Sequence, residues 1–210
     1  MKKILLIAFL FPLFAFDGSE KFLNNIAPYQ QDSYFKEKVY AEHDRQSFYA
    51  MKEPNQVINP ESYDLHLLNA AVFYATNKLR KEKGLKELQF SPQLRNAAVI
   101  HSSQMIEKNF FDHFNPRTRA LHSPDDRMKL CSVQSTAYGE NVDLNNITMP
   151  SHNTYLQVAE TIVKDFLNSP PHKKIMLDKN FTRLGCSAMF EGKDKNGARY
   201  YKATQDYAAN

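Results

Sequence analysis

Three side chains of types that can do chemistry lie in turn-like parts of the sequence. His113 occurs in FFDHFNP, Glu140 in YGEN and His172 in SPPH. Side chains at such turns and strand edges commonly face a binding or catalytic site. Two neutral imidazoles and one carboxylate can hold a divalent metal such as zinc, with one position left open to water. The same groups can instead form a hydrogen-bonded cluster without a metal, and the sequence leaves both interpretations open.

Helical patterns dominate the first half of the region that carries these residues. Apolar residues recur every three or four positions from Leu65 and predict a helix that ends near Gly84. Ser91-Pro92 and Ser123-Pro124 each combine an N-cap residue with a proline at the first helical position, which predicts two further helices. His101 falls on the apolar side of the second helix, where we interpret it as a core histidine with both nitrogens paired.

Strand patterns come later in the chain. Tyr138–Val142 is typical of a strand or strand edge, and a further apolar helix face ends at Phe166 before two prolines. The tail from 184 to 208 predicts a hairpin with its turn at 193–197, which contains Asn-Gly. Early helices followed by late antiparallel strands indicate a mixed α+β domain.

The N-terminus has the pattern of a secretory signal. Lys2 and Lys3 precede an apolar run from Ile4 to Phe16, which is shorter than the roughly 20 residues of a membrane span. We predict a signal peptide over 1–19 and a secreted or periplasmic protein; an uncleaved anchor is the alternative. No other apolar run approaches a membrane span, so no stable span is expected after signal removal.

The remaining chain is expected to form one domain preceded by a polar segment. We predict an N-terminal extension and linker over 20–62 and a single domain over 63–210, since 210 residues with 42% hydrophobic content can close one ordinary core. The net charge of +4 is scattered, with no aromatic and basic stripe. Nucleic acid is therefore not an expected partner. The sequence carries no strong signal for dimerisation.

Two cysteines, Cys131 and Cys186, follow the predicted signal. An exported protein can keep a disulfide, and an even count permits one bridge, although spacing alone does not show that the two thiols meet. We predict a Cys131–Cys186 bridge. A thiol hydrolase that uses one of these residues is the least favoured function, because export favours their oxidation.

The ordered motifs resemble a known family. The order NKLRKEKGLKEL, HSSQM, FFDHFNP, DDRM, YGEN, FLNSPPHKKIML, LGCS and ATQDY is similar to the bacterial, SCP-like branch of the CAP superfamily, which includes cysteine-rich secretory proteins, antigen 5 and pathogenesis-related 1. The resemblance covers roughly residues 64 to 208. It implies a three-layer α-β-α sandwich with a small antiparallel sheet, and a cleft that presents two histidines and two glutamates. His113, Glu140 and His172 match three of these four positions.

The fourth position departs from the animal and plant pattern. Phe166 resembles the tryptophan that precedes the second glutamate, so the matching residue is Ser169. Glu160 has the right type, but at about 100° per residue it points away from the apolar helix face. We predict a surface ion pair with Lys164 for it instead.

Several neighbouring residues are interpreted as structural. We expect Asn141 to pair backbone groups in the YGEN turn and Arg127 to hold a carboxylate of a loop rather than a ligand. The histidines outside the matched motifs are predicted to lie at the surface; they are His66, His122 and His152.

The favoured function is a secreted binding module. CAP proteins are widely associated with lipid binding and extracellular interaction, so the resemblance implies a lipid or other small extracellular molecule as ligand. The alternative is a metal-dependent hydrolase in which His113, His172 and Glu140 hold a metal-bound water. The loss of the second glutamate weakens that alternative, because one carboxylate cannot easily be both ligand and free base.

Overall fold

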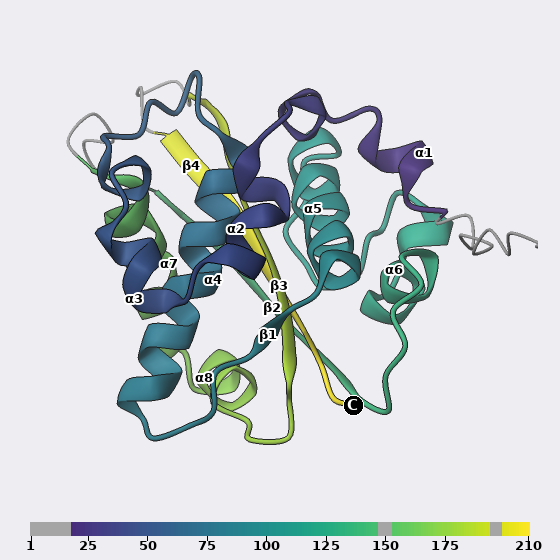
Figure 1. Ribbon diagram of the computed structural model, residues 1–210. Coiled ribbons are helices and arrows are strands. Elements are labelled where there is room, and N and C mark those ends of the chain that lie inside the picture. Colours follow the sequence, from purple (N-terminus) through teal and green to yellow (C-terminus); the bar gives the residue numbers. More distant parts are fainter. Residues whose placement is uncertain (1–17, 147–152, 194–198) are drawn as a thin grey trace, which may run out of the picture.

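The chain folds into three layers with a four-stranded sheet in the middle. A computed structural model describes residues 18–146, 153–193 and 199–210. Strands lie in the order β1-β3-β4-β2. Helices α4 and α7 cover one face of the sheet, and α5 and α6 lie on the other side (Figure 1). This is the α+β sandwich that the family resemblance implied.

The bounds of the elements follow in chain order. Segments of the N-terminal part are α1 (Glu20–Leu23), η1 (Ala27–Gln30), η2 (Tyr34–Lys36), α2 (Lys38–Glu42), α3 (Arg45–Ala50) and η3 (Glu53–Asn55). The helices of the two outer layers, with a short 3-10 turn, are α4 (Leu65–Glu82), α5 (Pro92–Glu107), η4 (Arg119–Leu121), α6 (Pro124–Leu130), α7 (Tyr155–Asn168) and α8 (Pro170–Met176). The strands are β1 (Gln89–Phe90), β2 (Tyr138–Asn146), β3 (Arg183–Lys193) and β4 (Arg199–Ala208).

The sheet is antiparallel except at one edge. β4 pairs antiparallel with both β2 and β3, whereas the two residues of β1 pair parallel with β3. The two strands of the predicted hairpin therefore pair as β3 and β4. The predicted turn at 193–197 falls almost wholly outside the described residues. The short parallel pair was not predicted, because a two-residue strand leaves no periodic signal.

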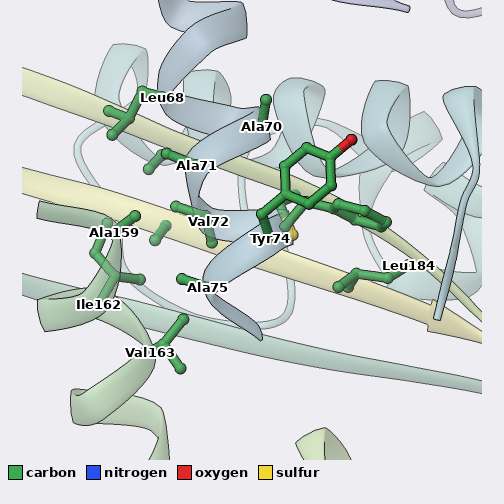
Figure 2. Packing of buried hydrophobic residues seen from close by; sticks show 14 of the residues in the cluster. Leu68, Ala70, Ala71, Val72, Tyr74, Ala75, Ala159, Ile162, Val163 and Leu184 are labelled. Carbon is green, nitrogen blue, oxygen red and sulfur yellow. The ribbon is translucent and has the colours of Figure 1, made fainter. Parts of the chain in front are cut away.

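Alternation along the strands divides the core into two clusters. In β4, Ala203 and Tyr207 face the cluster beneath α4 and α7, whereas Ala208 joins the cluster beneath α5. Small side chains of α4 and α7, such as Ala71 and Ala159, meet between the two helices (Figure 2). On the other face Gly185 allows α5 to approach the sheet closely, because a Cβ there would lie 2.0 Å from the backbone nitrogen of Arg95.

The segment that we predicted as an extension and linker contributes to both clusters. Three of its apolar residues are buried beside α5, namely Leu23, Ile26 and Tyr29. Four others are buried beside α4, namely Phe35, Val39, Phe48 and Ile58. The segment is thus packed into the folded unit rather than set apart as a linker. The predicted signal over 1–19 falls almost wholly on residues 1–17, outside the described part.

The described residues contain no helix that is long and apolar enough to cross a bilayer.

Replacement of Phe48 tests whether the N-terminal segment stabilises the domain. Phe48 is fully buried and stacks on Tyr74 with ring centroids 4.2 Å apart. We expect Phe48→Ala to lower the free energy of unfolding by about 3–5 kcal/mol, measured by urea denaturation. Val57 is 56% exposed, so Val57→Ala is the control and should stay within about 0.5 kcal/mol of wild type. Equal stability of both variants would show that the segment does not support the core.

Candidate functional site

Glu140 is a buried carboxylate that two residues hold from opposite ends. It lies in β2 with its side chain 2% exposed. Arg127 Nη2 donates to Oε2 at 2.5 Å, and the Nδ1 of His113 lies 2.8 Å from Oε1. Both carboxylate oxygens are therefore engaged by cationic or potentially cationic groups.

Arg127 connects the loop that carries His113 to the sheet. Its side chain is fully buried in α6, whose N-terminus is fixed by a capping box between Ser123 and Asp126. Besides Glu140, the guanidinium donates to the backbone carbonyls of His113 and Leu121, each at 3.0 Å. Arg127 thus holds a carboxylate, although we expected one in a loop and Glu140 lies in a strand. Its contacts also fix the backbone at His113.

Charge and burial set the protonation states of Glu140 and His113. Burial alone would raise the pKa of Glu140, but the hydrogen bond from His113 and the charge of Arg127 outweigh it, and the pKa lies below its usual value. The hydrogen bond to Glu140 raises the pKa of His113, although burial opposes this. Glu140 is ionised at neutral pH, and His113 carries a proton on Nδ1 that it donates to the carboxylate.

His113 is the exposed member of the cluster, whereas His101 is enclosed. The side chain of His113 is 41% exposed. His101 is wholly buried, with Nε2 3.0 Å from the carbonyl of Asp112 and 3.9 Å from Glu140 Oε1. Burial lowers the pKa of His101 to about 4, so the ring is neutral. We expected both nitrogens to be paired, but Nδ1 has no partner among the described residues.

His172 lies in a helix and not in the turn that we predicted. Pro170 and Pro171 occupy the first positions of α8, where a missing N–H costs nothing, so they begin a helix as well as ending the previous one. The ring of His172 meets Phe166 edge to face, with centroids 5.4 Å apart. Burial lowers the pKa of His172, and the charge of His113 lowers it further. The two imidazoles are thus within electrostatic reach of each other.

Asn141 and Ser169 have different positions relative to this site. Asn141 Nδ2 donates to the carbonyl of His172 at 3.1 Å, which joins β2 to α8. We expected Asn141 to pair backbone groups within the YGEN turn, so its partner lies in a different element from the one predicted. Ser169 stands at the junction of α7 and α8, and its side chain makes no capping bond. No hydrogen bond in the described part of the chain links Ser169 to His113, Glu140 or His172.

Asp206 is a member of the site that sequence reasoning missed. It lies directly opposite Glu140 in the pairing of β2 with β4 and is 1% exposed. Burial, and then the charge of Glu140, raise the pKa of Asp206 well above its usual value. Neither carboxyl oxygen of Asp206 has a hydrogen-bond partner among the described residues. A neutral, protonated Asp206 avoids placing a second negative charge beside Glu140 in the same buried space. The sequence signal that could have indicated Asp206 was its position in the last strand of the predicted hairpin, two residues before the end of that strand.

The described residues do not fit a metal ion well. Across 18–146, 153–193 and 199–210, no group of three or more His, Cys, Asp or Glu side chains is arranged to hold one. Both oxygens of Glu140 are already engaged, and the guanidinium of Arg127 brings a positive charge next to them. Zinc binding by His113, Glu140 and His172 stays a prediction that this geometry does not favour.

The cysteines do not form the predicted bridge. Both belong to the described part of the chain, and no disulfide joins them. Cys131 packs in the cluster beneath α5 and Cys186 in the cluster beneath α4, so the sheet layer separates them. Burial raises the pKa of Cys186 well above its usual value, which also disfavours a nucleophilic thiolate.

Other predictions for single residues had mixed outcomes. Glu160 is indeed half exposed, but it pairs with Lys78 of α4 at 2.7 Å and not with Lys164. His122 is exposed as predicted, whereas His66 is 1% exposed and contacts Tyr29, because the N-terminal segment covers it. His152 lies outside the described residues.

Comparison with known proteins defines the class to which this fold and site belong. Residues 73–207 match the family described as "CAP: Cysteine-rich secretory protein family". The match covers more than half of the chain, so the chain belongs to the CAP family.

Three relatives give the similarity in detail. The chain is 34% identical over 117 residues to the uncharacterized protein YkwD of Bacillus subtilis, covering 56% of this chain and 40% of that protein. It is 30% identical over 110 residues to the uncharacterized membrane protein YlbC of the same organism, covering 52% and 28%. A solved structure of an extracellular protein containing an SCP domain from Bacillus anthracis has a TM-score of 0.54 at 25% identity, covering 73% and 44%. The matched region thus spans less than half the length of each of these relatives.

A second acidic cluster joins β2, β4 and α7. The hydroxyl of buried Tyr201 lies 2.9 Å from both Asp143 Oδ2 and Asp165 Oδ2. Asn145 Nδ2 also donates to Asp165 at 2.8 Å. One phenol proton cannot serve two carboxylates, so a proton on Asp143 completes the hydrogen bonding. Burial raises the pKa of Asp143 to about 6, and the nearby Asp165 raises it as well.

This cluster predicts a pH dependence of stability. A carboxyl group whose pKa is raised on folding binds an extra proton in the native state between about pH 4 and pH 6, so stability falls as pH rises through that window. Asp143→Asn removes the charge, so at pH 8 we expect it to raise the free energy of unfolding by up to about 2 kcal/mol and to have little effect at pH 4. Urea denaturation at both pH values measures the difference.

The exposed Asp32 provides the control, Asp32→Asn, which should match wild type at both pH values. A destabilised Asp143→Asn protein at pH 8 would show that the ionised carboxylate is the favoured form.

Proposed function

We propose that this CAP-domain protein is exported and binds a small extracellular amphiphile, such as a lipid with an anionic head group, at the His113–Glu140 site. The observation that supports the proposal is an exposed imidazole, bonded to a buried carboxylate that raises its pKa, in the same loop as two exposed phenylalanines. The extracellular Bacillus anthracis neighbour and the predicted signal support export.

The polar half of the proposed site is His113. Because Nδ1 bonds to Glu140, the second ring nitrogen, Nε2, is the atom available to a ligand. The raised pKa of His113 keeps the ring protonated to higher pH than usual, and the buried Arg127 adds positive potential behind it. An anionic head group, a carboxylate or a phosphate, is the complement of such a donor.

The apolar half comes from the same loop. Phe111 and Phe114, on either side of His113 in sequence, are 44% and 52% exposed. Asp112 fixes the turn by accepting a hydrogen bond from the backbone N–H of Phe114 at 2.8 Å. Exposed aromatic residues next to a cationic group match a ligand with an apolar chain and a charged end.

The hydrolase alternative has weaker support. It needs Glu140 either as a metal ligand or as a free base, and here the carboxylate accepts from Arg127 and pairs with His113. The arrangement is better suited to orienting His113 than to moving protons itself.

Binding of oleate tests the proposal, with oleyl alcohol as the uncharged analogue. We expect wild type to bind oleate more tightly than the alcohol, and His113→Ala to remove most of that preference. We expect Phe111→Ser combined with Phe114→Ser to weaken binding of both probes by about tenfold, because two apolar contacts are lost. Isothermal titration calorimetry with EDTA present measures each affinity.

Val57→Ser changes an exposed apolar residue elsewhere and should leave binding unchanged. Oleate binding that requires added zinc and disappears in His172→Ala would contradict the proposal and favour the metal-dependent alternative. Equal binding by wild type and all the variants would place the ligand elsewhere.

A further inference from the structure

A separate hollow lies between the N-terminal segment and the first turn of α5. We call it the extension pocket and define it by Asn24, Tyr29, Lys36, Gln93, Arg95 and Asn96. Its volume is about 380 Å³. Small-ligand pockets of proteins commonly fall between roughly 300 and 1,000 Å³. The pocket lies at the N-terminal end of α5, whereas His113 follows its C-terminal end, so this inference does not depend on the proposed function.

The floor of the pocket is held rigid by hydrogen bonds. Arg95 is 2% exposed, and its guanidinium donates to Asn96 Oδ1 at 2.8 Å and to the carbonyl of Lys36 at 2.6 Å. The hydroxyl of Tyr29 donates to the same Oδ1 at 2.8 Å. Because these side chains are fixed without a ligand, little ordering is needed when one binds.

The charges around the pocket balance. Lys36 and Arg95 are cationic, and Glu20 and Glu37, which also line the hollow, are anionic. The ammonium of Lys36 lies 4.6 Å from the centroid of the Tyr29 ring. With two charges of each sign the lining carries no net charge, so it offers no electrostatic preference for an anion or a cation.

Three further polar side chains of the lining are amides, which both donate and accept hydrogen bonds. Asn24 and Gln93 are exposed at the wall of the pocket. Asn96 Oδ1 accepts three hydrogen bonds, one from Tyr29 and two from Arg95. The Nδ2 of Asn96 is then the group that can donate to a ligand. Hydroxyl groups of a sugar also donate and accept, so amide side chains pair with them without a charge.

We infer that the extension pocket binds a neutral, hydroxyl-rich ligand of one or two sugar rings. Neutral lining, paired donors and acceptors, a rigid floor and a suitable volume all agree with this class of ligand. Asn24, Tyr29 and Lys36 precede residue 73, where the CAP match begins. The pocket therefore depends on the N-terminal segment of this chain and not on the matched region alone.

Nuclear magnetic resonance titration of the full chain tests the inference. The probes are N-acetylglucosamine, its β-1,4-linked dimer and maltose, with glycine and sodium acetate as charged comparisons. We expect at least one saccharide to shift the backbone resonances of residues 92–96 in a saturable way. We expect Asn24→Ala combined with Asn96→Ala to weaken that binding by about tenfold, because two hydrogen-bonding side chains are lost.

Asn25→Ala is the matched control, since Asn25 is an exposed neighbour that does not line the pocket. It should bind within about twofold of wild type. Because Asn96 also supports Arg95, Asn24→Ala alone is measured as well and should weaken binding without loss of fold. The inference is overturned if no saccharide shifts these resonances, if the Asn24 variants bind as wild type does, or if glycine or acetate binds more tightly.

Discussion

The site depends on how one buried carboxylate is neutralised. Glu140 is almost fully enclosed, and an isolated charge in that position would cost several kcal/mol. Arg127 and His113 remove that cost by bonding to separate oxygens. Since Arg127 comes from α6, His113 from the loop after α5 and Glu140 from β2, the need to pair this charge brings three separate parts of the chain together.

The polar residues of the site have different roles. Glu140 and Arg127 are buried and supply position and charge, whereas His113 is the exposed part of the cluster. The Asn141 contact to the backbone of His172 extends the same arrangement to α8. Each oxygen of this carboxylate already has a hydrogen-bond partner, which is why we propose that Glu140 orients His113 and does not itself move protons.

Sequence patterns predicted the helices and the hairpin because each has a strong periodic or capping signal. The cap-plus-proline signals at Ser91 and Ser123 mark the starts of α5 and α6. The same signal at Ser169 was interpreted as a stop, because a helix ended immediately before it. The N-terminal segment was misjudged for a related reason: its helices are too short to show a period, and only tertiary packing stabilises them.

The members of the site were predicted to different extents. The motifs marked His113, Glu140 and His172 as candidates, and the structure joins the first two by a hydrogen bond. Arg127 was expected to hold a carboxylate of a loop, but its partner Glu140 lies in a strand. The sequence does not show that Asp206 faces Glu140, because strand register determines that pairing. The prediction of a cysteine bridge was wrong for a similar reason. Cys131 and Cys186 belong to core clusters on opposite sides of the sheet, and their spacing in the sequence does not show this.

A double-mutant cycle between Arg127 and Glu140 tests the central claim most directly. The free energy of unfolding is measured by urea denaturation for wild type, Arg127→Met, Glu140→Gln and the double variant. We expect each single variant to lose about 3–5 kcal/mol, because each leaves the other residue of the pair buried without its opposite charge. The double variant should be more stable than additivity predicts by about 2 kcal/mol or more. Additive losses within about 0.5 kcal/mol would contradict the account, because they would show that the two residues stabilise the fold independently.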